Sequence, residues 1–392
     1  MSELLIPLTT TGVPFNLIEP IVAKCSRTGI KDVSERKDYV FVLANDSGQH
    51  HDLQGYGAVL TDVSLTASKA RTDMASLPGV HSLKVANHVS DGDIVVMYPS
   101  GFVRTLYRVN SKNNVIFSTD RCNSNCVMCS QPPKKIDDSY LVEQNLKMIS
   151  LIDPKPEFIG ISGGEPTLLK DDLFRIMSAL KVHLPNTFVN MLTNGRMFFY
   201  SDFADKYAAV EHPRFRAAIP LYSDIPDEHD FVVQSKGAFV QTMRGLYNLG
   251  ELGQPIEIRV VLHKLTYRRL PQLAEFIYKN LPFAAHIAFM GMEIMGYVKK
   301  NLDLLWIDPV DYQEELYQAV AYLNAHEMNV SIYNHQLCVL KKVLWPFSRK
   351  SISDFKNIYL DECANCNVLE KCGGLFKSAH TIHSKYIKAI SS

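Results

Sequence analysis

What the sequence lacks argues against several classes of protein. Its 41 Lys and Arg residues are matched by 41 Asp and Glu residues, so the chain has no excess charge with which to coat nucleic acid or a membrane surface. No apolar run approaches the ~20 residues of a membrane span. The first residues show no basic segment ahead of an apolar one. We therefore expect no signal peptide and a cytoplasmic protein.

The sequence also lacks the spread cysteines of a disulfide framework. Most of its eight cysteines fall in two short clusters, at 122–129 and 363–372. In a large chain without a secretion signal, this pattern favours metal binding in a reducing compartment over disulfides. Cys25, His50 and His51 stand apart from these clusters, and we assign them no role, because a lone thiol is most often a small buried apolar side chain.

The length and composition predict more than one domain. With 392 residues, 46% of them apolar, the chain can form two or three domains with sizeable cores. Residues 1–110 are rich in strand-like runs and predict a β-rich accessory domain, with a hairpin whose turn contains Gly101. We expect a barrel over residues 111–335 and a small cluster-binding region over residues 336–392.

From residue 114 onward, strand-like and helix-like segments alternate. Apolar runs rich in β-formers recur, and segments with helical spacing separate them; the runs lie at 115–117, 158–162, 188–193, 215–221, 256–262, 287–290 and 330–333. Repeated β-α units predict a parallel sheet with right-handed crossovers. About six of them indicate an α/β fold with a partial (β/α)6 barrel, in which active sites collect at the C-terminal ends of the strands.

Three cysteines follow the first of these runs. Cys122, Cys126 and Cys129 can supply three thiolates to a metal centre. A structural zinc ion usually has four closed ligands, whereas a four-iron cluster held by three thiolates keeps one iron open to a ligand. The alternative is that these cysteines are buried or bind zinc.

The second run ends in a glycine pair. Gly163 and Gly164 precede Glu165 and Pro166. Two glycines let the backbone approach a ligand closely, and their N–H and C=O groups can bind a polar zwitterion. Taken alone, the same residues would fit an ordinary strand-to-helix turn.

The cysteine spacing C-x3-C-x2-C, followed one β-α unit later by Gly-Gly-Glu-Pro, resembles the signature of the radical S-adenosylmethionine (SAM) enzymes. The resemblance implies a [4Fe–4S] cluster on Cys122, Cys126 and Cys129, whose open iron holds SAM and whose electron cleaves it to a 5′-deoxyadenosyl radical. It also implies a set of residues that contact SAM, namely Met128, Gly163, Gly164, Glu165, Asn194, Ser223, Gly291 and Glu293. Met128 stands where the family often carries an aromatic residue, and a thioether can also pack on a π face.

The second cysteine cluster predicts a second metal centre. Cys363, Cys366 and Cys372, with Cys338 upstream, could by themselves form a zinc site. After a radical SAM barrel they resemble the SPASM or twitch regions of that family, which implies one auxiliary iron–sulfur cluster of the [4Fe–4S] type. If Cys338 is the fourth ligand, the cluster is closed; without it, one iron stays open to substrate. We expect Cys338 to be a ligand.

Several features occur together: the N-terminal β-rich segment, Cys-Val-Met-Cys-Ser-Gln-Pro-Pro, Gly-Met-Glu after the sixth strand, and Trp345-Pro346-Phe347 between Cys338 and Cys363. In this combination, and over nearly its full length, the sequence resembles the radical SAM maturases of the His-Xaa-Ser repeat peptide system. This resemblance implies an oxidoreductase that modifies a ribosomally synthesised peptide. It implies as partners a precursor peptide with His-Xaa-Ser repeats, a reductant such as flavodoxin or ferredoxin, and a second radical SAM maturase. Two alternatives stay open: a radical SAM enzyme that acts on a small molecule or an RNA nucleotide, and a zinc-stabilised binding protein without catalysis.

Overall fold

The computed structural model describes residues 8–43, 51–64, 76–85, 88–153, 156–353 and 356–391, so His50 lies outside it. Contacts divide the chain into two compact units. One unit comprises residues 1–116, 139–159 and 182–187, and the other comprises residues 117–138, 160–181 and 188–392. Within the described ranges, no helix has the length and apolar character needed to cross a membrane.

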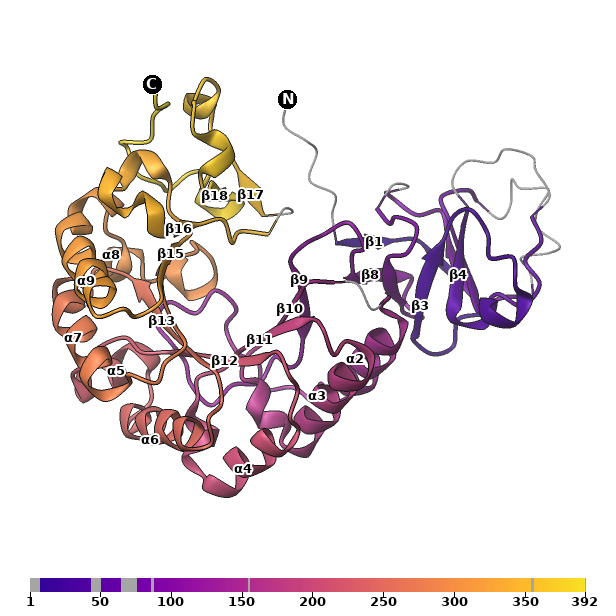
Figure 1. The fold of residues 1–392 in the computed structure, drawn as a ribbon. Helices are drawn as coiled ribbons and strands as arrows, with labels where there is room; N and C mark the ends of the chain where they lie inside the picture. Colours follow the sequence, from indigo (N-terminus) through magenta and orange to yellow (C-terminus); the bar gives the residue numbers. More distant parts are fainter. Residues whose placement is uncertain are drawn as a thin grey trace. The chain divides into compact units, whose positions relative to one another are not determined.

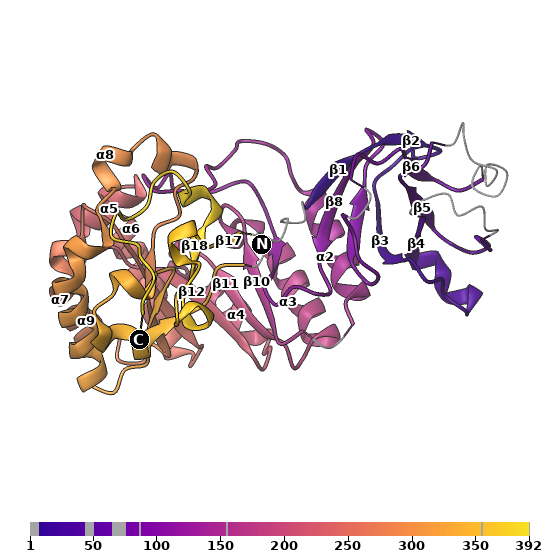
Figure 2. The ribbon, with the colours of Figure 1, turned by 90° about the horizontal axis from the view of Figure 1, so that it is seen from above.

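The first unit is built on one eight-stranded sheet with the order β1-β8-β7-β3-β4-β5-β6-β2. Its strands are β1 (Thr9–Thr11), β2 (Val13–Phe15), β3 (Ile21–Ser26), β4 (Tyr39–Leu43), β5 (Ala58–Thr61), β6 (Gly79–His81), β7 (Ile94–Met97) and β8 (Phe102–Tyr107). The two outer strands, β1 and β2, are separated in the chain by Gly12 alone, so the sheet closes on itself (Figure 2). A side chain at Gly12 would collide with the carbonyl of His81.

Apolar side chains on the inner face of this sheet form the core of the first unit. Cys25 is 1% exposed and belongs to this core, as expected for a lone thiol. The predicted hairpin is confirmed, because β7 and β8 pair antiparallel around Gly101, which has a φ of +79°. Helix α2 (Tyr140–Leu151) packs against β3 and β7, and Lys147 forms an ion pair with Asp38 at 2.6 Å. The first helix after the cysteine loop thus belongs to the accessory unit.

The other large sheet also has eight strands, which follow one another in chain order (Figure 1). They are β9 (Asn114–Phe117), β10 (Phe158–Ser162), β11 (Phe188–Leu192), β12 (Phe215–Pro220), β13 (Ile256–Leu262), β14 (His286–Gly291), β15 (Val330–Tyr333) and the short β16 (Ser348–Arg349). All pairs from β11 to β16 are parallel. This arrangement confirms the partial barrel: the seven predicted runs correspond to β9–β15, and only the short β16 was not predicted.

The helices of the second unit follow the apolar spacing of the sequence. They are α3 (Asp171–His183), α4 (Ser201–Ala209), α5 (Pro226–Val233), α6 (Ala238–Glu251), α7 (Leu270–Asn280), α8 (Leu302–Leu305) and α9 (Gln313–Ala325). One face of α3 is buried, namely Leu173, Ile176, Met177 and Leu180. Asp308 is the N-cap of a 3-10 turn (Pro309–Tyr312) that precedes α9.

A buried charged network lies on the concave face of this sheet. The strand alternation places Glu257 and Arg259 on one side of β13. Glu257 pairs with Arg259 at 3.2 Å and with Arg216 of β12, and it contacts Nδ1 of His286 at 2.8 Å. His286 contacts the hydroxyl of Ser331 through Nε2 at 3.0 Å. The network links the first residues of β12 to β15 below the ends that carry the loops.

Candidate functional site

The first cysteine cluster lies in the loop that follows β9. Two backbone hydrogen bonds join this loop to the loop after β10: the N–H of Gly164 donates to the carbonyl of Thr119 at 2.6 Å, and the N–H of Glu165 donates to that of Arg121 at 2.8 Å. A Cβ at Gly164 would overlap the Arg121 carbonyl, and one at Gly163 would lie 2.5 Å from the Thr119 carbonyl. The glycine pair is therefore required for the two loops to meet.

The other side of the cysteine loop is also held by the backbone. Asn125 donates its N–H to the carbonyl of Val233, in the last turn of α5, at 3.0 Å. The carbonyl of Cys129 accepts from the N–H of Tyr297, which follows β14, at 2.8 Å. Segments far apart in the sequence thus fix the position of the three thiols.

The three thiols are neighbours in an apolar setting. Burial raises the pKa of Cys122 to about 11 and that of Cys126 to about 12, and it also raises the pKa of Cys129. The charges of neighbouring thiolates contribute to the rise of the first two pKa values, and the N–H of Ser124 donates to Cys122 Sγ at 3.4 Å. Buried thiolates need a cationic partner to stay ionised, and a metal centre supplies it. The donor set therefore fits a metal-based cofactor.

A single ion and a cluster make different demands on this donor set. A tetrahedral zinc ion requires its ligands to converge on one point. An iron–sulfur cube distributes its thiolates over separate irons, so its ligands need not meet at one point.

Glu165 lies beside this loop and is 1% exposed. Its Oε1 accepts from the hydroxyls of Thr167 and Thr193, each at 2.6 Å. Its Oε2 accepts from the N–H of Asn194 at 2.6 Å. Burial raises the pKa of Glu165, although these hydrogen bonds oppose the rise. The carboxylate thus joins the loops after β10 and β11, and its predicted contact with SAM stays a prediction.

The loop after β11 adds a residue that the sequence reading missed. Asn194, predicted to approach SAM, donates its side-chain amide to Asn123 in the cysteine loop at 2.6 Å. Arg196 donates to the carbonyl of Asn123 at 2.5 Å and to the hydroxyl of Ser124 at 3.0 Å. In the sequence, only the position of Arg196 directly after Thr-Asn-Gly indicated that this residue could lie near the site. Arg196 holds the segment between the first two cysteines.

The other predicted SAM contacts lie at the same loop-bearing ends of the strands. Met128 is buried in an apolar cluster that includes Tyr222. Ser223 is fully buried. Its hydroxyl donates a hydrogen bond at 2.6 Å to Glu228, which lies in the first turn of α5. Glu293 forms an ion pair with Lys356 at 3.2 Å.

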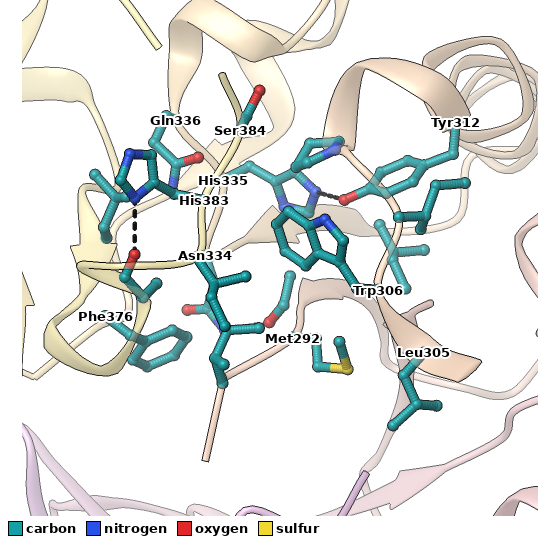
Figure 3. Close-up of a pocket in the computed structure, with 18 residues that line it drawn as sticks. Met292, Leu305, Trp306, Tyr312, Asn334, His335, Gln336, Phe376, His383 and Ser384 are labelled. Carbon is teal, nitrogen blue, oxygen red and sulfur yellow. Dashed lines mark hydrogen bonds between the residues drawn. The ribbon is translucent and has the colours of Figure 1, made fainter. Parts of the chain in front are cut away.

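Gly291, the remaining residue of this set, ends β14 and lines a cavity of about 50 Å³ (Figure 3). Trp306, Met292 and Leu305 give this cavity an apolar wall. His335 is buried beside it and shares a 2.8 Å hydrogen bond with the hydroxyl of Tyr312. Burial lowers the pKa of His335 to about 4, so the ring is neutral near pH 7.

The structure brings the four C-terminal cysteines together. Cys338, in the turn Leu337–Val339, packs against the apolar cluster that contains Cys363. Burial raises the pKa of both thiols, and the charges of neighbouring cysteines raise them further: Cys372 and Cys363 for Cys338, and Cys372 and Cys366 for Cys363. The same fit to a metal cluster therefore applies here.

Two features hold Cys338 and Cys372 near each other. The indole N–H of Trp345 contacts the carbonyls of Leu337 and Leu340 at 3.0 and 3.2 Å, which supports the turn that carries Cys338. Gly374, next but one to Cys372, accepts a hydrogen bond from the side chain of Gln336 at 2.7 Å. The short sheet of β17 (Asn357–Ile358) and β18 (Leu375–Phe376) closes the same region.

A partial (β/α) barrel with three partly buried thiols in the loop after its first strand can hold a metal cofactor at the C-terminal ends of the strands. Residues 116–277 match the family model of the radical SAM superfamily.

Three further likenesses concern parts of the chain. A GTP 3′,8-cyclase of Petrotoga mobilis (strain DSM 10674 / SJ95) is 27% identical over 186 residues, which cover 45% of this chain and 54% of that protein. The chain thus spans about half the length of this curated relative. Streptococcus suis SuiB bound to S-adenosylmethionine is 16% identical, with a TM-score of 0.45 over 56% of this chain and 50% of SuiB. Native anSMEcpe with bound AdoMet and the Cp18Cys peptide is also 16% identical, with a TM-score of 0.44 over 56% of this chain and 62% of its own. Scores this low do not extend the activities of these two proteins to this chain.

Proposed function

We propose that this chain is a radical SAM enzyme that modifies a ribosomally synthesised peptide. Cys122, Cys126 and Cys129 would hold a cluster that, once reduced, would supply the electron for cleavage of an S–C bond of SAM to methionine and a 5′-deoxyadenosyl radical. The observation that carries the proposal is the joint position of Cys122, Cys126 and Cys129 in one loop that is locked to Gly163 and Gly164. The spacing of three thiols leaves a fourth coordination position of a four-iron cluster for SAM.

The residues around this loop have distinct parts in the proposal. The glycine pair places backbone groups beside the cysteine loop, where they can meet the methionyl end of SAM. Glu165 adds a buried carboxylate whose Oε2 accepts one hydrogen bond in the structure and can accept another from an ammonium group. Arg196 and Asn194 hold the segment Asn123–Ser124 and so orient Cys122. The three thiols are partly buried in this loop.

The C-terminal cysteines form the second part of the proposal. Cys338, Cys363, Cys366 and Cys372 would hold an auxiliary cluster with four thiolate ligands, closed to substrate. The packing of Cys338 against the apolar cluster around Cys363 supports this assignment. Such a cluster would transfer electrons or support the surface that faces the peptide.

The choice of a peptide substrate rests on the sequence resemblance to the His-Xaa-Ser maturases. A small molecule or nucleotide is the second candidate, and the 27% identity to a GTP 3′,8-cyclase favours it for the region that the two proteins share. A flavodoxin or ferredoxin would supply the electron, and a second maturase would act on the same peptide.

Anaerobic reconstitution tests the proposal. Protein supplied with iron, sulfide, SAM and a reductant should release 5′-deoxyadenosine and should do so faster with a His-Xaa-Ser repeat peptide than with GTP. Mass spectrometry of the peptide should show a change of mass. If GTP but not the peptide increases the release of 5′-deoxyadenosine, the substrate is a nucleotide and the peptide proposal is wrong. A colourless protein that retains zinc after reconstitution would instead indicate the non-catalytic binding protein.

A further inference from the structure

A short segment near the end of the described chain, Ile387–Ile390, contacts the four-cysteine set at several points. Ile387 is buried in the apolar cluster with Val339 and Cys363. The N–H of Ile390 donates to Cys366 Sγ at 3.4 Å, and the carbonyl of Ile390 accepts from the N–H of Asn367 at 3.0 Å. The segment is therefore anchored by one apolar side chain and by paired backbone hydrogen bonds.

A second N–H of the same segment reaches a different sulfur. The backbone N–H of Lys388 lies beside the thiol of Cys338 and favours its ionised form, which lowers the pKa of that thiol. Cys338 and Cys366 belong to separate parts of the chain, so the segment connects the upstream cysteine with the downstream group. Two N–H groups at alternate positions point to two of the four sulfurs.

Amide hydrogen bonds to sulfur have a known consequence in iron–sulfur proteins. The positive end of an N–H dipole stabilises negative charge on a thiolate, and a reduced cluster carries one more negative charge than an oxidised one. Hydrogen bonds to the sulfurs, together with solvent exposure, therefore help to set the reduction potential.

We infer that Ile387–Ile390 is a wall of the auxiliary site that raises the reduction potential of the cluster and shields its sulfurs from solvent. The inference rests on the proposed auxiliary cluster. The two N–H groups act on the potential, and Ile387 keeps them in place. Because these groups belong to the backbone, no side-chain motif in the sequence reveals them.

Proline substitution removes one N–H at a time, because proline has no amide hydrogen. The test uses the full chain with Cys122, Cys126 and Cys129 changed to Ala, so that only the auxiliary cluster can form. Lys388→Pro and Ile390→Pro should each lower the midpoint potential in an EPR-monitored titration. We expect a roughly tenfold fall in the ratio of reduced to oxidised cluster at the parent midpoint, which equals ~59 mV for one electron.

Ala389→Pro is the matched control. It introduces the same ring between the two positions, at a residue whose N–H donates to neither sulfur in the described contacts, so its potential should equal that of the parent. Ile387→Ala provides a variant without proline: both N–H groups remain, their anchor is weakened, and the potential should fall by a smaller amount.

A measurement on metal-free protein tests the shielding directly. Maleimide labelling followed by mass spectrometry should be several-fold faster at Cys366 in Ile390→Pro and at Cys338 in Lys388→Pro than in the parent or in Ala389→Pro. If the parent holds a normal amount of auxiliary iron and the midpoint potentials of Lys388→Pro and Ile390→Pro equal that of the parent, the inference is wrong but the auxiliary cluster stands. A parent without auxiliary iron would overturn the auxiliary cluster, and the inference with it. Equal losses in all three proline variants would show a general backbone effect and also reject it.

Discussion

The backbone N–H of Asn194 donates a hydrogen bond to Oε2 of Glu165 at 2.6 Å, so one buried carboxylate joins the loops that follow β10 and β11. The same carboxylate lies beside the cysteine loop, because the N–H of Glu165 donates to Arg121. A change at this residue should therefore affect both the fold of the site and the binding of its cofactor.

We expect Glu165→Ala to lower the affinity for SAM while leaving the iron content unchanged. A hydrogen bond from an ammonium group to this carboxylate would contribute ~1.5–3 kcal/mol, so the dissociation constant should rise by about 10- to 100-fold. Equilibrium dialysis of the reconstituted protein measures it. Thr167→Val, which removes one donor to Glu165 but keeps the carboxylate, should lower stability without a comparable loss of affinity. Unchanged SAM binding in Glu165→Ala would contradict the assignment.

Replacing any one of Cys122, Cys126 and Cys129 with Ala should abolish the formation of 5′-deoxyadenosine. Each loss leaves a cluster with too few thiolate ligands to keep SAM on its open iron. Chromatography of anaerobic reactions with reductant measures the product. Cys25→Ala is the control, because that thiol is buried in the core of the accessory unit and should not influence cleavage. Cleavage at the parent rate in any of the three variants would reject the cluster assignment.

Gly164→Ala should prevent the cysteine loop from meeting the loop after β10. The added Cβ would overlap the carbonyl of Arg121, so the backbone must shift. We expect a loss of at least half of the iron at the SAM-binding site, measured by iron analysis and EPR. Gly253→Ala serves as control: its φ of +64° makes the substitution strained, but no atom lies within 4 Å of the new Cβ. A normal cluster in Gly164→Ala would show that the two loops can separate without consequence.

The triple change of Cys363, Cys366 and Cys372 to Ala should remove about half of the bound iron and leave substrate-independent cleavage of SAM detectable. The two cysteine sets would bind separate clusters, so loss of one should not empty the other. Cys338→Ala should give a partly labile auxiliary cluster, seen as iron loss during gel filtration. A fully stable cluster in Cys338→Ala would indicate three ligands and an iron open to substrate.

Glu257 should make stability depend on pH in the acid range. Burial would raise its pKa, but the hydrogen bond from His286 and the charges of Arg259 and Arg216 outweigh burial and lower it from 4.5 to about 2. A lowered carboxyl pKa contributes stability above the unfolded value, and this is lost as pH falls through the folded value. The difference in free energy of unfolding between the parent and Glu257→Gln should therefore shrink by about 3 kcal/mol between pH 4.5 and 2. Urea unfolding at several pH values measures it.

Glu314→Gln is the matched control for this measurement. Glu314 is exposed and pairs with Lys341, so solvent screens its charge and its substitution should change the pH profile little. An equal pH dependence in both variants would show that the buried network has no special influence.

Much of the barrel was predictable from short-range patterns. The buried face of α3 shows the helical spacing of apolar residues, at Leu173, Ile176, Met177 and Leu180. Burial of one helix face requires this spacing, regardless of which element packs against that face. The strands were predictable because fully buried parallel strands need continuous apolar runs. The position of Cys122 after β9 also followed from the chain alone, since parallel strands place their C-terminal ends at one edge.

The sequence by itself determined the alternation of strands and helices, the cysteine spacing and the glycine pair, because each of these depends on neighbours a few residues away. Three contacts were decided only by the tertiary structure. Gly12 joins the two edges of the accessory sheet, the hydroxyl of Ser223 donates a hydrogen bond to Glu228, and Arg196 holds the segment before Cys126. The tertiary structure also decided that backbone N–H groups of Ile387–Ile390 meet Cys338 and Cys366. Such contacts are set by the packing of distant elements. Every residue except proline carries the same backbone N–H group. The hydrogen-bond partner of that group therefore depends on its position in the folded chain and not on the type of residue that carries it.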